Sequence, residues 1–297
     1  MSLLAAFALA AGLTATEAPP FTLYHAPGHA AEAKLVAERA PVMAEDLRRR
    51  LEAPPLPPST LCLLDQDTSV APASVCDSAL AMPEWAAGIA VPSRHEIVVR
   101  LDRVGRYPHR QLLSVVAHET VHLLEGDART PPWFREGVAA LMAHQGEWMD
   151  SLYLLGSPVA SAAHPLDELG ARFRTAGGTA EARVAYAGSF SFLTFLVRRH
   201  GDRLPARVLE DLRAGASFEE AFAHATGGVS LREEEQAWAE SMNGPLRWLA
   251  VAGESWALWL MLALLMITGW LVKRRRTRRI LARWEEQETE QETLDGL

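Results

Sequence analysis

Residues Ala117–Ala140 read AHETVHLLEGDARTPPWFREGVAA, and this stretch indicates both the local fold and a chemistry. His118 and His122 are four positions apart. On a helix both imidazoles therefore lie on one face and can point at one ion. The segment PHRQLLSVVA before them and the apolar residues after them have helical spacing, and Gly126 is a suitable helix stop. We therefore predict a helix over Arg110–Glu125.

A second helix is predicted over Pro132–Gln145, because proline is tolerated in the first turn of a helix. Glu136 falls about one turn into this helix. Thirteen residues separate it from His122, enough for a turn and an antiparallel return. The small residues of GVAA, from Gly137 onward, would let this helix pack closely against the first. Glu136 is thus the predicted third ligand of the ion.

Two other carboxylates compete for the third position. Glu125 is three residues after His122 and faces roughly the same way, and Asp127 follows the helix end. A known alternative arrangement has a Gly three residues after the second His and a ligand three residues further on. Those positions hold Glu125 and Ala128 here, so that pattern is broken. Both carboxylates stay open as alternatives to Glu136.

The predicted ion is Zn²⁺, because a catalytic zinc usually has three protein ligands and one open position. Its predicted ligands are His118, His122 and Glu136. Glu119 lies next to the first ligand, where its carboxylate can take a proton from a water molecule at that ion. Glu119 is therefore the predicted catalytic residue, a general base. Tyr186 is a weaker candidate for a transition-state donor, with a buried structural role as the alternative.

HETVH followed by PPWFREGVAA resembles the gluzincin metallopeptidases, and more closely the membrane-associated peptidase MA-like group, which has a two-His helix followed by a Pro, Trp, Glu, Gly segment. FTLYHA, AYAGSFSFLTFL, LRAGASFEEAFAHATG and EEEQAWAE extend the resemblance weakly over Phe21–Met242. It implies a zinc metallopeptidase domain over residues 19–245, zinc on His118, His122 and Glu136, and a peptide or protein substrate.

Strand patterns come early in the chain and helical patterns late, which predicts an α+β domain. The expected fold class is a zincin-like metallopeptidase domain with a small N-terminal sheet, a helical second half and one C-terminal transmembrane helix. Strands are predicted at Phe21–Ala26, Leu61–Leu64 and Glu96–Leu101. Fold analogy suggests that Glu96–Leu101, if it is a sheet edge, accepts an extended substrate. Besides the two helices above, the expected helices are His29–Leu51, Ala180–His200, Leu204–Ala214, Ser217–Thr226 and Ser230–Met242.

The apolar run SWALWLMLALLMITGWLV occupies Ser255–Val272 and is followed directly by KRRRTRR. These 18 uncharged residues can just cross a hydrocarbon core, and the basic cluster indicates the cytoplasmic side. We therefore predict a transmembrane helix over 255–272, a cytoplasmic tail over 273–297 and an extracytoplasmic body.

Residues 1–18, MSLLAAFALAAGLTATEA, predict a signal peptide that is cleaved before Pro19. No Lys or Arg precedes the apolar run of this leader, so an uncleaved leader stays open. Cys62 and Cys76 are the only cysteines, and they are either a disulfide or two buried thiols.

The net charge of −8, from 37 acids and 29 bases, argues against general nucleic-acid binding. The sequence thus predicts a membrane-anchored zinc peptidase. The alternative is a non-catalytic binding or scaffold protein that retains the fold, and hydrolysis of a bond other than a peptide also stays open. A scaffold has no physical need for Glu119, which favours the enzyme.

Overall fold

The structure is a computed structural model of the chain, and it describes residues 12–68, 70–72, 74–84, 86–105, 111–126, 128–143, 166, 179–242 and 259–277. By their internal contacts the residues divide into two units, Met1–Asn243 and Gly244–Leu297, and each unit is considered by itself. The first unit is a mixed α+β structure with one five-stranded sheet and a majority of helices.

The sheet has the strand order β1-β2-β3-β5-β4. The three inner strands run parallel, whereas β1 and β4 are antiparallel to their neighbours at the two edges. A long helix lies in the connection from β2 to β3, whereas loops and short 3-10 helices connect β3, β4 and β5. The strands are β1 Thr14–Ala18, β2 Phe21–His25, β3 Ser59–Leu64, β4 Gly88–Val91 and β5 Glu96–Arg100, and the 3-10 helices are η1 Pro27–His29, η2 Asp77–Ala81, η3 Pro92–Arg94 and η4 Leu101–Arg103.

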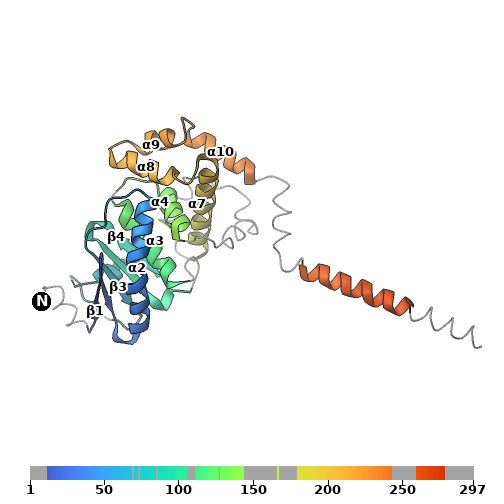
Figure 1. Cartoon of the computed structure of the whole chain (residues 1–297), viewed down its shortest axis with the longest axis horizontal. Coiled ribbons are helices and arrows are strands. Elements are labelled where there is room, and N and C mark those ends of the chain that lie inside the picture. Colours follow the sequence, from blue (N-terminus) through green and yellow to red (C-terminus); the bar gives the residue numbers. More distant parts are fainter. Residues whose placement is uncertain are drawn as a thin grey trace, which may run out of the picture. The chain divides into compact units, whose positions relative to one another are not determined.

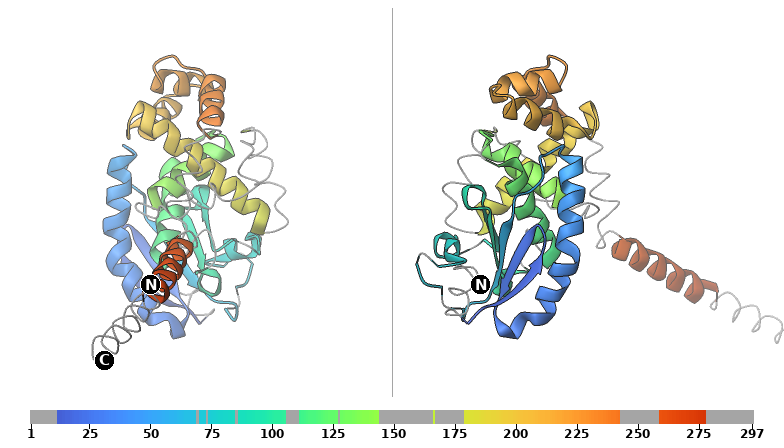
Figure 2. Two further views of the ribbon diagram at one scale, coloured as in Figure 1. Left: turned by 90° about the vertical axis from the view of Figure 1, so that its right-hand side faces the viewer. Right: turned by 60° about the vertical axis from the view of Figure 1, so that its left-hand side comes forward.

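Helices α2 (Ala30–Arg50) and α3 (Leu112–Glu125) cover one face of the sheet. Figure 2 shows α2 lying along this face. Side chains alternate across a strand, so every second residue of the inner strands points at these helices. The buried cluster on this face contains Phe21, Leu23, Leu61, Leu63, Ile97 and Val99 from the strands, with Ala33, Val36, Ala40 and Ala44 of α2 and Val115, Val116 and Leu123 of α3.

A smaller cluster on the opposite face is tied together by a disulfide. The intervening residues of the same strands, including Tyr24, Leu64 and Val98, point to this face. Cys62 of β3 is bonded to Cys76, with a Cα–Cα distance of 5.9 Å. The sequence left the state of these cysteines open, and the structure has them as a disulfide.

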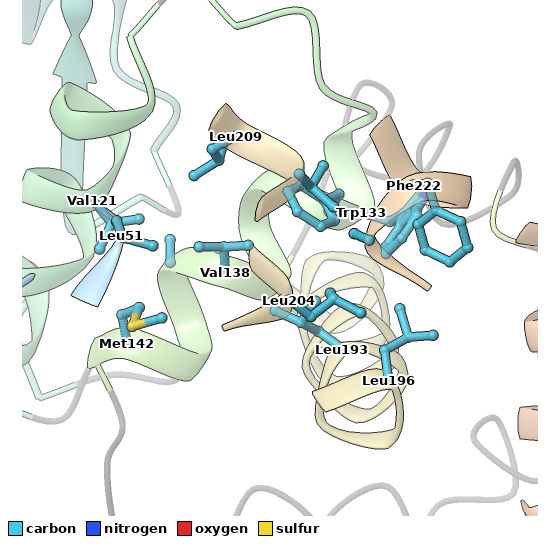
Figure 3. Packing of buried hydrophobic residues seen from close by; sticks show 14 of the residues in the cluster. Leu51, Val121, Trp133, Val138, Met142, Leu193, Leu196, Leu204, Leu209 and Phe222 are labelled. Carbon is cyan, nitrogen blue, oxygen red and sulfur yellow. The ribbon is translucent and has the colours of Figure 1, made fainter. Parts of the chain in front are cut away.

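The helical half packs around α4 (Pro132–Ala143), which lies between α3 and α7 (Thr179–His200). The remaining helices are α8 (Leu204–Arg213), α9 (Phe218–Ala225) and α10 (Leu231–Met242). They lie together at one end of the first unit (Figure 1). Figure 3 shows Val121 of α3, Trp133 and Val138 of α4, and Leu193 and Leu196 of α7 in the buried core that joins these helices.

Glycine at position 137 allows α4 and α7 to pack closely. A Cβ atom at this position would lie 2.9 Å from the backbone oxygen of Ser189 in α7. The sequence suggested that the small residues of α4 face the first helix of the motif. Gly137 instead faces α7, and α4 is packed on both sides.

Residues 259–277 of the second unit form one helix. None of the helices among the described residues is long and apolar enough to cross a membrane. The predicted fold class is therefore wrong in adding a transmembrane helix over 255–272. Residues 255–258 of that span lie outside the described residues.

Part of the predicted leader belongs to the sheet. Thr14–Ala18 pair with β2 as strand β1, and Ala18 is buried. Residues 1–11 lie outside the described residues, as do residues 278–297 of the predicted tail. The leader and its cleavage stay predictions.

We predict that Gly137→Ala lowers the free energy of unfolding by about 1–3 kcal/mol, because the new methyl group overpacks the contact with the backbone of α7. Urea denaturation measures the change. Gly28→Ala is the matched control, since a Cβ atom there has no neighbour within 4 Å. Equal stabilities of the two variants would contradict the close packing of α4 on α7.

Candidate metal centre

Two histidines of α3 form one side of the centre. His118 and His122 are 2% and 6% exposed, and their ring centroids are 4.8 Å apart in an edge-to-face arrangement. The Nε2 atoms of the two rings are 3.2 Å apart. The helix itself ends as expected, since Gly126 follows with a positive φ of 65°. Both imidazoles therefore present Nε2 to the same point.

Glu136 approaches this point from α4. The helix begins after Pro131, whose carbonyl oxygen accepts bonds from the N–H groups of Phe134 and Arg135. The buried apolar side chains of α4 fix its rotation, and this directs Glu136 at α3. Its Oε2 atom lies 3.2 Å from Nε2 of His118 and 3.6 Å from Nε2 of His122. The structure thus brings the three predicted ligands together, within 4.8 Å of one another.

The distances between these three atoms fit a divalent cation such as zinc. Two ligand atoms at about 2.0–2.1 Å from a tetrahedral zinc ion are roughly 3.3 Å apart. The measured separations are 3.2, 3.2 and 3.6 Å. Two imidazoles and one carboxylate also match a known donor set of catalytic zinc sites. Zinc could therefore be held here without a large rearrangement of the side chains.

The structure separates Glu125, one of the two competing carboxylates, from this point. Glu125 is buried on the other side of the His122 ring, where its Oε2 atom is 3.1 Å from Nδ1. It therefore contacts the ring nitrogen that faces away from Glu136. Asp127, the second alternative, lies outside the described residues.

Glu119 is buried between α3 and the edge strand β4. It is 4% exposed, and its carboxylate accepts a hydrogen bond from the backbone N–H of Ala90. A Cβ atom at position 88 would lie 2.6 Å from Oε1 of Glu119 and 2.8 Å from Cγ1 of Val115. Only glycine at position 88 lets the strand come this close to the carboxylate.

Burial raises the pKa of the Glu119 carboxyl to about 7. Burial alone would lower the pKa of His122, but the carboxylates of Glu136 and Glu125 outweigh it and raise this pKa to about 10. Burial would raise the pKa of Glu136, yet the adjacent imidazoles hold it well below its usual value. The raised pKa means that His122 holds a proton at neutral pH in the metal-free chain. This proton has to leave when a cation binds, so the affinity for the cation depends on pH.

Tyr186 of α7 lies beside the centre. It is half-buried, and its ring centroid is 6.0 Å from that of His118. The structure therefore places this residue near the predicted ligands. Its role as a transition-state donor stays a prediction.

The strand beside the centre differs from the one that the sequence suggested. Glu96–Arg100 forms β5, which pairs with β3 on one side and β4 on the other, so it is not an edge of the sheet. The edge strand is β4, which contacts α3. Gly88 and Ala90 could not be recognised from the sequence, because GIAV is short and lies between proline-containing loops. The apolar character of GIAV was the one available signal.

No known protein family matches the chain, and no curated protein gives a significant match to it. The resemblance of HETVH and PPWFREGVAA to the peptidase MA-like gluzincins therefore stays a prediction. The geometry of the His118, His122 and Glu136 group by itself does not identify a family.

We predict that Glu119→Gln removes a pH dependence from the stability of the metal-free chain. The pKa of Glu119 is about 7 in the folded chain, against an ordinary value of 4.5. Between pH 4.5 and 7 the folded chain therefore keeps a proton on Glu119 that the unfolded chain has lost. The stability of the wild type therefore falls as the pH rises from about 4.5 to 7, and the variant lacks this loss.

Urea denaturation in the presence of a chelator should show the variant gaining up to about 3 kcal/mol relative to wild type over this pH range. A stability difference that is constant from pH 4.5 to 8 would contradict the burial of an ionisable Glu119.

Proposed function

We propose that the chain is a zinc-dependent hydrolase of peptide bonds. The observation that carries this proposal is the convergence of Nε2 of His118, Nε2 of His122 and Oε2 of Glu136 at mutual distances of 3.2–3.6 Å. A buried carboxylate, Glu119, follows the first of these ligands directly. A structural metal site needs no adjacent base, so Glu119 favours a catalytic site over a purely structural one.

His118, His122 and Glu136 would hold the zinc ion. When bound, zinc lowers the pKa of water toward neutrality and polarises a carbonyl group. Glu119 accepts the proton of the attacking water and then delivers it to the leaving amine. Burial favours the neutral form of this carboxyl, which supports its role in returning the proton to the leaving group.

An extended peptide could lie along β4. The backbone oxygen of Ala87 accepts a hydrogen bond from the N–H of Arg100 in β5. Because the backbone groups of successive residues in a strand point to opposite sides, those of Gly88 and Ala90 point away from β5. The N–H of Ala90 already bonds the carboxylate of Glu119. A substrate strand that paired with the backbone groups of Gly88 and the carbonyl oxygen of Ala90 would pass the base. The edge strand therefore supports a peptide as the substrate class.

The disulfide supports an oxidising compartment for the first unit, because such bonds persist outside the reducing cytosol. An extracytoplasmic location thus stays part of the proposal. The alternative, a binding or scaffold protein, predicts no peptide cleavage, and the following experiment separates the two.

Glu119→Gln should keep one zinc ion per chain and lose about 10²–10⁴-fold in kcat, because it removes the proton acceptor and no ligand. Elemental analysis measures zinc, and cleavage of casein or a peptide library measures turnover. Glu219→Gln, at an exposed position of α9, is the matched control and should cleave like wild type. A wild type that binds zinc and cleaves no peptide would favour the scaffold, and equal turnover of Glu119→Gln and wild type would refute the proposed base.

Gly88→Ala should lower kcat by about 100-fold and leave zinc affinity unchanged, because the nearest atoms that its methyl group displaces belong to Glu119 and Val115 and not to a ligand. Steady-state kinetics and zinc titration measure the two effects. Gly28→Ala, which adds the same group in open space, serves as the control. Unchanged kcat in Gly88→Ala would contradict the placement of β4 against the base.

A further inference from the structure

Glu125 is the last residue of α3, one turn beyond His122. Its side chain is 1% exposed, and its Oε2 atom lies 3.1 Å from Nδ1 of His122. The opposite nitrogen of the same ring, Nε2, faces His118 and Glu136. The imidazole of His122 therefore lies between two carboxylates, with one at each ring nitrogen.

The Glu125 carboxylate is also contacted from the helix that carries Glu136. Nε of Arg135 is 3.8 Å from Oε2 of Glu125, and Arg135 directly precedes Glu136 on α4. The guanidinium of Arg213, from α8, donates to the backbone oxygen of Leu124 at 3.4 Å. Two guanidinium groups from neighbouring helices thus lie at the end of α3 that carries Glu125.

These contacts do not explain Glu125 as a purely structural residue. Within the described part of the chain, its Oε1 atom is buried without a hydrogen-bond partner. A buried carboxylate with an unsatisfied oxygen costs stability, and an apolar side chain of similar size often packs there at no loss. Among the described residues, the shortest polar contact of the Glu125 side chain is to His122.

We propose that Glu125 is a positioning residue that accepts the Nδ1–H of His122 and so presents the bare Nε2 atom to the zinc ion. Arg135 keeps the Glu125 carboxylate in place. This inference rests on the proposed zinc site, and it adds a second contact between the two helices that carry the ligands. Arg135 and Glu136 are neighbours on α4 and serve opposite sides of the His122 ring. Arg135 contacts the carboxylate of Glu125 on the Nδ1 side, and Glu136 lies on the Nε2 side. The packing of α4 on α3 therefore sets both the third ligand and the orientation of the second.

The test compares Glu125→Leu, Glu125→Gln and the control Glu219→Leu, which makes the same change at an exposed position of α9. Competition with a chromophoric chelator gives the Kd for zinc, and urea denaturation gives the stability of the metal-free chain. We expect Glu125→Leu to raise the Kd by about 10- to 100-fold, as the loss of a partner of a metal-bound His does. The metal-free stability should not fall, and the control should match wild type.

Glu125→Gln keeps an oxygen that can accept from Nδ1–H, so its Kd should rise less than that of Glu125→Leu. A wild-type Kd in Glu125→Leu, or an equal rise in both variants, would overturn the inference while leaving the zinc site in place. A wild type that binds no zinc would instead overturn the proposed function itself.

Nitrogen-15 NMR of the zinc-loaded wild type gives a second readout that needs no variant. A proton on Nδ1 of His122 with zinc on Nε2 supports the positioning role. Zinc on Nδ1, or a proton on Nε2, would overturn it even if Glu125→Leu failed to fold.

Discussion

The packing of α4 against α3 is the constraint on which the candidate centre depends. It brings a carboxylate from one helix to two imidazoles of the other, in a place where all three groups have lost most of their contact with water. Burial opposes charge on each group, and only mutual attraction or a bound cation compensates for this. The raised pKa of His122 and the lowered pKa of Glu136 express the same attraction in the metal-free chain. A divalent cation would satisfy both carboxylate and imidazoles at once.

The sheet contributes the other part of the centre through its edge strand. β4 lies against α3, and Gly88 and Ala90 place its backbone at the carboxylate of Glu119. The Cys62–Cys76 disulfide joins the central strand β3 to the segment that leads through η2 toward β4. Ile89 of β4 packs against the same small cluster that contains the disulfide. The position of the base thus depends on packing on both faces of the sheet.

Much of the first unit could be predicted from the sequence because its signals are local. Helical spacing located α3 to within two residues, and Pro132 marked the start of α4. The side-chain periodicity of a helix then placed His118 and His122 together. Glu136 could be proposed as their partner because an antiparallel return between two helices is short enough to be recognised along the chain.

The remaining features depend on contacts between distant residues. Whether β4 or β5 forms the sheet edge is decided by strand order, and a short GIAV segment carries no mark of that order. Glu125 was weighed as a ligand because position alone cannot distinguish the two nitrogens of His122, and only the packed helix shows that it contacts Nδ1. The transmembrane prediction rested on a count of uncharged residues, and none of the helices in the described part of the chain is long and apolar enough to cross a membrane.

X-ray absorption at the zinc edge of the metal-loaded chain tests the central claim most directly, because it counts the ligands of the ion. The account predicts two imidazole nitrogens at about 2.0–2.1 Å and carboxylate or water oxygens at about 2.0–2.2 Å. Replacement of Glu136 by Ala should change the oxygen shell and leave both imidazoles. A spectrum with one imidazole or none, or one that Glu136→Ala leaves unchanged, would contradict the convergence of these three side chains on a single cation.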